Sequence, residues 1–525
     1  MPLVSPGRPG AGADLSARRP AGLKVRACQS ASGGVYRCVG RGATLPGIPL
    51  SSAPVSIPAL PVVRPSACPG LVRVVAAADG GLCRIKLPGG RLDARQARAI
   101  AAAARSYGSG AIDATNRANL QLRGIRDGAA DALAGALLDA GLGPRTSAAD
   151  AADAANAADV AQDKAALAAS DDVRNLMLSP LAGLDPAALL DSRALARPLL
   201  DMLTHEPRRG ELSPKFSIQL DGGESVAALD HPHDIWLAAR RRGDGALRIA
   251  AGLAGCPPVS SDDSPAWFDV APDQAVALVR ALLLAFLDLA PADVTRMRAL
   301  LATGGERALR ERAQHYAPFP LAADPALAGW RRMPADAALR FGARPSLDAA
   351  RCSVGAQFVL GRLDATQLER LAALAEAEGD ATLSMTPWQG VFVHGVRRER
   401  APVVLDALAS LGLVCTPSDP LAALVACTGS AGCAKARADT KHDALALAAR
   451  VGHPVDVHLT GCERHCALPH PATYTLVAVA PARYDLYRRD AATGLGAPLA
   501  RHLTIDQAAA RLTDLRHSQD TTTDA

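Results

Sequence analysis

The sequence predicts an α+β protein with pseudo-two-fold symmetry, and two observations carry this prediction. Residues 90–125 align without a gap to residues 361–396, and 12 of the 36 aligned positions are identical. Each copy has the pattern strand, helix, strand, because apolar alternation gives way to helical periodicity and then returns. The period of 271 residues is far too long for a solenoid, so it indicates a duplicated module.

The first copy predicts its elements in order. Residues 82–87 alternate apolar and polar side chains, which is typical of a half-buried strand. An Ala-rich helix is expected over 93–105, with Asp93 as its N-cap and two glycines after its end. A second strand is expected from Ile112. Residues 147–170 are rich in Ala and Asp and predict a surface helix or a linker.

The end of the first copy predicts an anion-binding surface. Four polar side chains occupy alternate positions there: Arg117, Asn119, Gln121 and Arg123. On a strand all four would share one face, where guanidinium and amide groups can hold carboxylates. Their counterparts in the second copy are Trp388, Gly390, Phe392 and His394. We therefore expect one active site, served by the first copy, with an ordinary solvated strand face as the alternative.

Two further segments repeat this cationic, amide-rich chemistry. Arg174 and Asn175 precede an apolar turn. Lys215 begins a segment in which polar residues alternate with apolar ones as far as Asp221, so a strand with Lys215 on its polar face is expected. Either segment could be ordinary surface, but together with the first they favour a polyanionic ligand.

Four cysteines near the C-terminus predict a metal centre. They form two pairs, Cys427 with Cys433 and Cys462 with Cys466. Four thiolates from one short region are what a [4Fe–4S] cluster requires. A structural zinc site is the first alternative, although five residues between Cys427 and Cys433 exceed its usual spacing. Free thiols are the second alternative, and disulfides are disfavoured because the other cysteines are scattered.

Composition limits the class of protein. The length of 525 residues suggests several domains, and the net charge of +5 arises from the basic first 70 residues, so the remainder is nearly neutral. Nucleic acid is therefore not the expected partner. The most apolar run, 275–289, is interrupted by Arg280 and Asp288, so it predicts a buried helix and not a membrane span. We expect a cytoplasmic monomer.

The predicted boundaries follow the repeat and the cysteines. Residues 1–65 are rich in Pro, Gly, Ser and Arg and predict a disordered or wrongly annotated extension. The remaining segments are a first half-domain, a first α/β domain, a second half-domain, a cysteine-bearing α/β domain and a polar tail, at 66–146, 147–345, 346–415, 416–510 and 511–525.

These motifs together resemble the sirohaem sulfite and nitrite reductases over residues 70–480. The order is Thr115-x-Arg117 with Gln121, then Arg174-Asn175, then Pro214-Lys215-Phe216, and finally the two cysteine pairs. The resemblance implies two ferredoxin-like half-domains and two α/β cluster-type domains around a central pocket. It also implies that the cationic positions hold tetrapyrrole carboxylates and that Cys466 lies nearest the macrocycle.

Three stretches resemble one branch of that family, the precorrin-3B synthases. They are residues 67–71, the surroundings of Cys427 and Cys433, and residues 461–476. Ser217 stands where the reductases usually carry a second lysine, and the loss of a cation is compatible with a macrocycle held as substrate. The spacer between the cysteine pairs is also short for a sulfite reductase.

This resemblance implies an O2-dependent monooxygenase of aerobic cobalamin biosynthesis. It would hydroxylate precorrin-3A at the meso carbon between rings A and D, and a ring A acetate would close a γ-lactone. The implied cofactors are a [4Fe–4S] cluster and a mononuclear non-haem iron, with reduced nicotinamide or another electron donor as cosubstrate. Two alternatives stay open: a sirohaem-dependent sulfite or nitrite reductase, and a non-catalytic iron–sulfur electron carrier.

The ligands of the mononuclear iron are not evident from the sequence. His231, His233 and Asp234 have suitable side chains, but the intervening Pro232 predicts a surface turn. His465 and His470 flank the last cysteine and could tune the cluster or donate protons. His394 lies on the face equivalent to the anion-binding surface, so it is a further candidate for the cleft.

Overall fold

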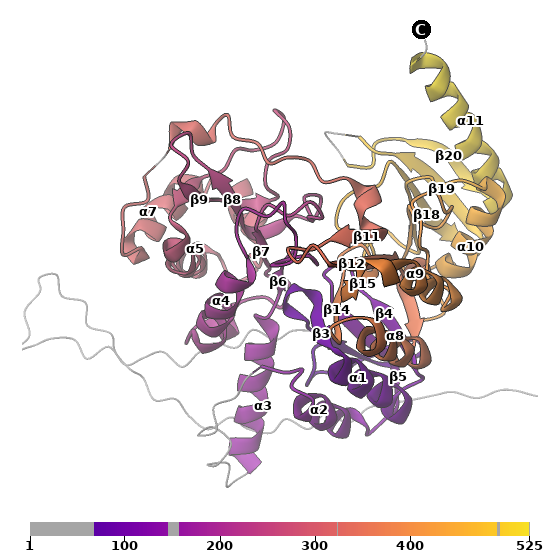
Figure 1. Cartoon of the computed structure of the whole chain (residues 1–525), viewed down its shortest axis with the longest axis horizontal. Coiled ribbons are helices and arrows are strands. Elements are labelled where there is room, and N and C mark those ends of the chain that lie inside the picture. Colours follow the sequence, from indigo (N-terminus) through magenta and orange to yellow (C-terminus); the bar gives the residue numbers. More distant parts are fainter. Residues whose placement is uncertain (1–67, 145–156, 323, 491–493, 524–525) are drawn as a thin grey trace, which may run out of the picture. The chain divides into compact units, whose positions relative to one another are not determined.

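The computed structural model describes residues 68–144, 157–322, 324–490 and 494–523 (Figure 1). The extension predicted for 1–65 lies outside these residues. The described residues form four five-stranded sheets that fall into two matching pairs. The α+β fold with a duplicated module, expected from the internal repeat, is therefore confirmed.

The two half-domain sheets exchange one strand each. The first has the order β1 (Val75–Ala77), β2 (Gly80–Ile85), β5 (Leu120–Ile125), β4 (Ala111–Ala114), β13 (Arg362–Asp364). The second has the order β11 (Gly342–Pro345), β12 (Arg351–Gln357), β15 (Gly390–Arg397), β14 (Thr382–Met385), β3 (Arg91–Asp93). Strand β13 of the second copy thus completes the first sheet, and β3 of the first copy completes the second.

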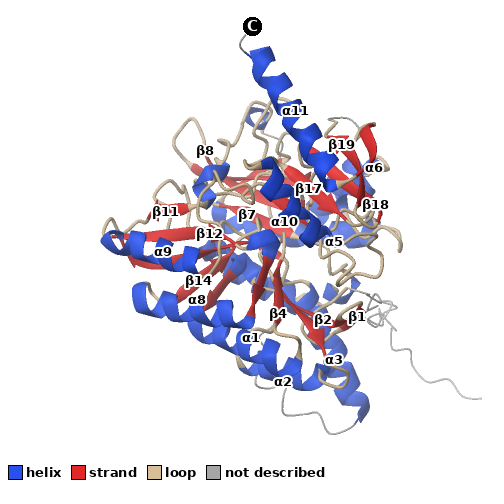
Figure 2. Ribbon diagram, turned by 90° about the vertical axis from the view of Figure 1, so that its right-hand side faces the viewer, coloured by secondary structure: helices blue, strands red, loops and turns tan. Residues whose placement is uncertain are grey.

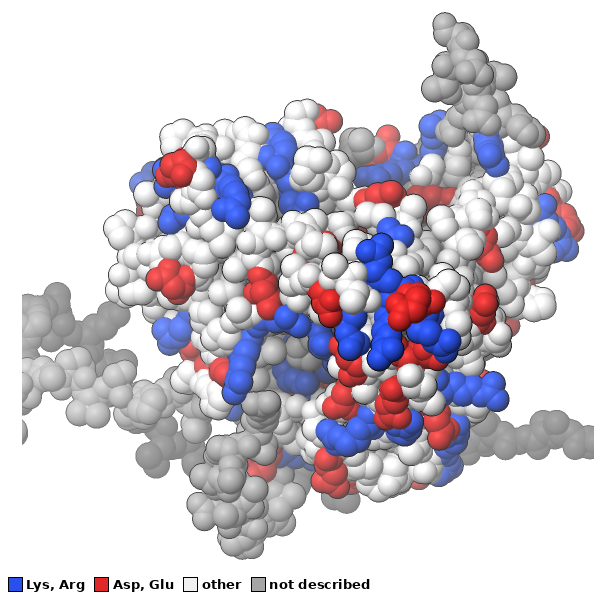
Figure 3. Space-filling model, in the orientation of Figure 1, with Lys and Arg blue, Asp and Glu red and all other residues white. Residues whose placement is uncertain are grey.

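Helices α1 (Ala94–Tyr107) and α8 (Ala365–Glu378) pack side by side and join the two half-domains. Figure 2 shows them as one layer beside the strands. Each begins at an Asp, Asp93 or Asp364, in a complete capping box, because the repeated sequence supplies Gln at the third helical position. Figure 3 shows positive and negative side chains interspersed over this region, where Arg98 of α1 pairs with Glu376 of α8.

The two α/β domains also match each other strand for strand. The first sheet has the order β6 (Leu176–Met177), β7 (Ile218–Asp221), β8 (His233–Arg241), β9 (Leu247–Gly255), β10 (Phe268–Val270). The second has the order β16 (Leu424–Ala426), β17 (Val457–Thr460), β18 (Tyr474–Ala480), β19 (Arg483–Arg488), β20 (Pro498–Leu503). In both, the first three strands are parallel and the last two antiparallel.

Helices cover these sheets and bury most of their apolar side chains. The most buried is α5 (Ala275–Leu289), as its apolar sequence predicted. The other helices are α2 (Ala130–Asp139), α3 (Ala157–Asp172), α4 (Arg193–His205), α6 (Met297–Ala302), α7 (Glu306–Tyr316), α9 (Ala401–Ser410), α10 (Thr440–Val451) and α11 (Ile505–Thr523). Among the described helices, none has the length and apolar character that crossing a membrane requires.

Two strands are shorter than predicted, and both differences affect candidate site residues. β5 begins at Leu120, because Ala118 has φ of +56° and Thr115 Oγ1 accepts hydrogen bonds from the backbone N–H groups of Arg117 and Asn119. Arg117 therefore lies in the β4–β5 turn, and the prediction that it shares a strand face with Arg123 is wrong. β7 begins at Ile218, so Lys215 precedes the strand.

Candidate metal centre

The four candidate cluster cysteines line one cavity of about 600 Å³. Cys427 directly follows β16, and Cys462 follows β17 after one intervening residue. Because these strands are parallel neighbours, their carboxyl ends meet at one edge of the sheet, which brings the two pairs together. Cys433 and Cys466 lie further along the same two loops.

Backbone contacts hold the two loops against each other. The Cys427 N–H donates to the Leu459 carbonyl, and the Gly461 N–H points at Cys427 Sγ at 3.2 Å. A side chain at Gly461 would place its Cβ 2.5 Å from that of Ala436, so only glycine allows this approach. Backbone N–H groups that point at the sulfur are also the contacts that iron-bound thiolates accept.

The spread of the sulfurs fits a cluster better than a single ion. Burial raises the pKa of Cys466, and the nearby thiolates of the other three cysteines raise it further, so the four groups interact. Thiolates on one tetrahedral zinc ion would lie roughly 4 Å apart. Among the described residues, however, no three of these sulfurs lie within 4.8 Å of one another. A larger multi-iron centre therefore fits this donor set.

A buried charge network links the cluster loop to the half-domains. Asp113 of β4 pairs with Arg123 of β5 at 3.2 Å and with Arg362 of the exchanged strand β13 at 2.5 Å. Lys441 of α10 lies 4.0 Å away. Burial alone would raise the pKa of Asp113, but the three cations lower it. Arg123 also donates to the carbonyl of Gly432, beside Cys433, at 2.8 Å, so it supports the cluster loop.

Among the predicted anion-binding residues, Arg117 has a positive charge that no ion pair with a described residue neutralises. Its half-buried side chain makes no hydrogen bond or ion pair with another described residue. Burial and the neighbouring cations Arg296 and Arg84 lower its pKa to about 10, so it remains charged at neutral pH. Arg84 lines the cysteine cavity together with Gln121, and its guanidinium donates to the Gln121 carbonyl once that amide is oriented for it.

Of the predicted substrate-binding residues, Gln121 and Arg123 line that cavity, whereas Arg117 and the others do not. Asn119 accepts a hydrogen bond from the backbone of Leu87. Arg174 is buried and donates to the Leu142 carbonyl and to Asp171. The Asn175 amide donates to backbone carbonyls around residue 215, and the Lys215 side chain is exposed. Substrate contact by Asn119, Arg174, Asn175 and Lys215 stays a prediction that this geometry does not strengthen.

The histidine candidates are placed differently from expectation. Pro232 is exposed and follows a turn at 229–230, as expected, whereas the side chains of His231, His233 and Asp234 around it are buried. The two ring nitrogens of His233 have no hydrogen-bond partner among the described residues. His394 does not reach a cleft, because its ring lies in the core between the Ser353 and Ser384 hydroxyls.

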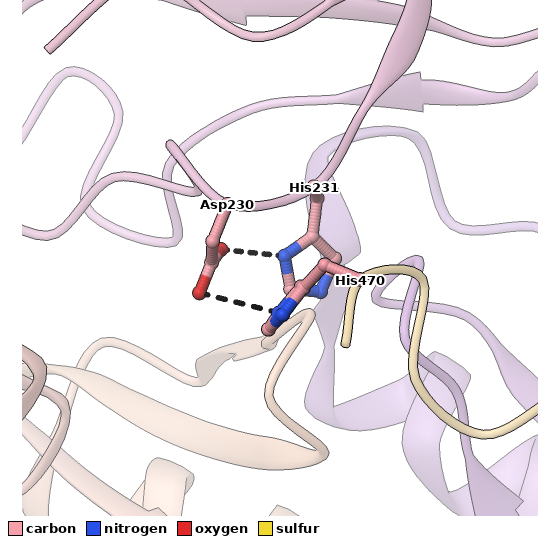
Figure 4. A group of neighbouring side chains, drawn as sticks. All are labelled: Asp230, His231 and His470. Atoms are coloured by element: carbon pink, nitrogen blue, oxygen red, sulfur yellow. Dashed lines mark hydrogen bonds and ion pairs between the residues drawn. The ribbon is translucent and has the colours of Figure 1, made fainter. Parts of the chain in front are cut away.

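The structure also adds a residue that sequence reasoning missed. Asp230 contacts both His231 and His470, whose loops belong to different domains (Figure 4). Nothing in the sequence links positions so far apart. The sequence signal that could have indicated this site was the pair Asp230-His231, which directly precedes the β8 sequence.

Comparison with known families agrees with this architecture. The nitrite/sulfite reductase ferredoxin-like half-domain matches residues 76–140 and 344–411, and the nitrite and sulphite reductase 4Fe-4S domain matches 169–321. Together these matches cover more than half of the chain. The chain belongs to the nitrite and sulfite reductase family. The match to the 4Fe-4S domain falls on the first α/β domain, whereas the four cysteines lie in the second.

The individual relatives include a precorrin-3B synthase and several ferredoxin–nitrite reductases. A precorrin-3B synthase from a Sinorhizobium species is 29% identical over 457 residues, which span 86% of this chain and 88% of that protein. The ferredoxin–nitrite reductase of Synechococcus elongatus is 28% identical over 75% of this chain and 76% of its own. The chloroplastic enzyme of Zea mays is 29% identical over 73% and 67%.

A solved structure supports the same family fold. The NirA protein of Mycobacterium tuberculosis superposes with a TM-score of 0.67 at 19% identity, covering 83% of this chain and 80% of its own. This likeness confirms the reductase-type fold. The enzymes among the relatives make the chain an oxidoreductase, and its match to the 4Fe-4S domain supports an iron–sulfur cluster.

Proposed function

We propose that this chain is a precorrin-3B synthase, which uses O2 to hydroxylate the reduced tetrapyrrole precorrin-3A. One oxygen atom would enter the meso carbon between rings A and D, and the other would leave as water, with two electrons and two protons from a donor. A ring A acetate would then close the γ-lactone. A [4Fe–4S] cluster bound by Cys427, Cys433, Cys462 and Cys466 would supply the electrons singly.

The observation that carries this proposal is the half-buried guanidinium of Arg117, which has no ion-pair partner among the described residues and whose charge neighbour Arg84 lines the cavity of the four cysteines. A half-buried cation that no carboxylate hydrogen-bonds is available to an anionic ligand, and Asp234 is the nearest protein carboxylate that acts on it. Arg84 and Arg296 add positive charge around it, although Arg296 is paired with Asp234 at 3.0 Å. Tetrapyrrole carboxylates suit such a group, since arginine binds carboxylates in a bidentate manner.

Two further observations favour precorrin-3A over a permanent sirohaem. The precorrin-3B synthase among the relatives aligns over most of both chains. In addition, Ser217 occupies the position where the reductases usually carry a lysine, and its buried hydroxyl has no hydrogen-bond partner among the described residues. Fewer fixed cations are consistent with a macrocycle that must enter and leave.

A sirohaem-dependent nitrite reductase is the second candidate. Its support is the nitrite reductases of plants and cyanobacteria, which align at nearly the same identity as the synthase. Here the same cationic groups would hold sirohaem as a resident cofactor. An electron carrier without catalysis leaves the unpaired Arg117 unexplained.

The deciding experiment supplies isotopic O2 to the purified protein with precorrin-3A and a reductant. We expect one labelled oxygen in the tetrapyrrole product, a broad thiolate-to-iron absorption before substrate is added, and no sirohaem bands. Sirohaem absorption with reduction of nitrite or sulfite, and no labelled product, would overturn the proposal in favour of the second candidate.

Arg117→Ala tests the carboxylate contact separately. Loss of the guanidinium should raise KM for precorrin-3A at least tenfold, since a charge-assisted hydrogen bond contributes about 1.5–3 kcal/mol. Acid-labile sulfide should be unchanged, and exposed Arg95→Ala on α1 is the matched control. An unaltered KM in the Arg117 variant would remove this residue from the substrate site.

A further inference from the structure

We propose that Asp230, His231 and His470 bind one divalent transition-metal ion, with Fe²⁺ as the native occupant. Asp230 Oδ1 lies 2.6 Å from His231 Nδ1, and Asp230 Oδ2 lies 3.6 Å from His470 Nε2 (Figure 4). All three ligand atoms lie within 4.8 Å of one another, which no other such trio of described residues achieves. Two imidazoles and one carboxylate form the ligand set typical of non-haem Fe(II) oxygenases.

These separations suit a single ion. Ligands bound about 2.1 Å from a metal at right angles lie roughly 3 Å apart. The observed separations of 2.6 and 3.6 Å bracket that value, so small side-chain movements would complete the coordination. The Asp230 and His470 side chains are 36% and 26% exposed, so one side of the ion would stay open for further ligands.

The outer contacts of both histidines favour metal binding. His231 Nε2 lies 3.2 Å from the Pro387 carbonyl, and His470 Nδ1 lies 3.4 Å from the Pro471 carbonyl. A carbonyl only accepts, so each of these nitrogens carries the hydrogen in the neutral ring. With a cation between them and Asp230, the lone pairs of His231 Nδ1 and His470 Nε2 would then bind it, whereas without a cation they would repel the carboxylate. Metal-binding histidines are usually oriented in this way by a second hydrogen bond.

The carboxylate is oriented as well. Arg340 Nη2 lies 3.3 Å from Asp230 Oδ2, and the Arg340 guanidinium stacks over the Trp388 ring at 4.0 Å. The edge of His231 packs against the same ring at a centroid distance of 6.3 Å. Arg340 and Trp388 therefore orient two of the three ligands, Asp230 and His231. A lone surface ion pair would have no need of such support.

The site also lies close to the cluster along the chain. His470 follows Cys466 by four residues in the β17–β18 loop, so their Cα atoms lie within about 15 Å. Metal binding follows from the side-chain geometry alone. Its use for oxygen activation, with electrons from the cluster, rests on the proposed function.

The experiment titrates Mn²⁺ anaerobically into the cluster-containing protein and follows the sharp solution EPR signal, which is lost when the ion binds. We expect one equivalent to bind and Fe²⁺ to displace it. Asp230→Asn and His470→Ala should weaken binding at least tenfold without changing acid-labile sulfide. Exposed His442→Ala is the matched control and should bind as the unmodified protein does. His470 is only half-buried, so its variant is expected to fold.

Each outcome decides one of the two proposals. Equal Mn²⁺ affinity in the His470→Ala and unmodified proteins, or no binding at all, would overturn the metal site even if precorrin-3A is hydroxylated. Specific binding that depends on Asp230 and His470, without labelled oxygen in the product, would retain the metal site and reject the oxygenase.

Discussion

At the residue scale, similar side chains in this chain have different roles because their partners differ. Arg123 and Arg117 were predicted as equivalent anion binders. Arg123 is neutralised by Asp79 and Asp113 inside the protein, whereas Arg117 has no described partner. The sequence shows which residues are cationic. It does not show which of them form ion pairs, because the partner carboxylates lie far away along the chain. The positive φ of Ala118, which places Arg117 in a turn and not on the strand of Arg123, was also not predictable from the sequence.

The cysteines give the sharpest residue-scale prediction. Cys427→Ala, Cys433→Ala, Cys462→Ala or Cys466→Ala should each lower acid-labile sulfide by more than half, because each removes one iron ligand. Sulfide belongs to the cluster alone, so it is the measurement of choice. Cys256→Ala is the control, since burial raises the pKa of this thiol to about 12 and keeps it protonated. Sulfide loss in the control would show that the ligand assignment is wrong.

At the element scale, the exchanged strands connect the half-domains to the metal centre. β13 places Arg362 against Asp113 of the opposite copy, and Arg362 also donates to Thr428 in the cluster loop at 3.1 Å. The repeat predicted the strand–helix–strand core of the module and Asp93 as the N-cap of its helix. It could not predict the exchange, because a short strand such as Arg91–Asp93 satisfies the same pattern in either sheet.

Asp113→Ala tests this connection. The change leaves Arg123, Arg362 and Lys441 near one another without their shared carboxylate. Removing one member of a buried ionic network costs about 3–5 kcal/mol, so chemical denaturation should shift to lower denaturant by a matching amount. Exposed Glu376→Ala, which breaks only the pair with Arg98, should cause a much smaller shift because solvent screens that pair. Similar shifts in both variants would contradict the role of Asp113.

At the scale of the whole molecule, the two copies share one architecture but carry different functional residues. The loops after β16 and β17 carry the cysteines, whereas the equivalent loops after β6 and β7 carry none. The duplication and the cysteine pairs were enough to predict the fold and the cluster region. The Asp230, His231 and His470 trio was not predictable, because it forms only where the loops before β8 and β18 meet.

The stability of the whole chain should fall in mild acid. Burial between two serines lowers the pKa of His394 to about 3, whereas the ordinary value is 6.5. Below about pH 6.5, His394 therefore binds a proton in the unfolded chain but stays neutral in the folded chain. The free energy of unfolding decreases as the pH falls from there. At pH 5 this histidine alone accounts for roughly 2 kcal/mol.

His394→Gln tests this effect. Denaturant unfolding at pH 7.5 and at pH 5 should show a smaller loss of stability in the variant than in the unmodified protein. The comparison between the two pH values removes the cost of the substitution itself. An equal loss in both proteins would show that His394 does not contribute to the acid sensitivity.

The exchange of β3 and β13 bears on how this chain arose. Neither half-domain sheet is complete without a strand from the other copy, so a single-copy ancestor would have needed a second, identical subunit to complete its sheet. Such an ancestor would be a strand-swapped homodimer, in which every loop occurs twice. Fusion of two copies into one chain would allow them to diverge, so that one copy carries the cysteines and the other Arg117.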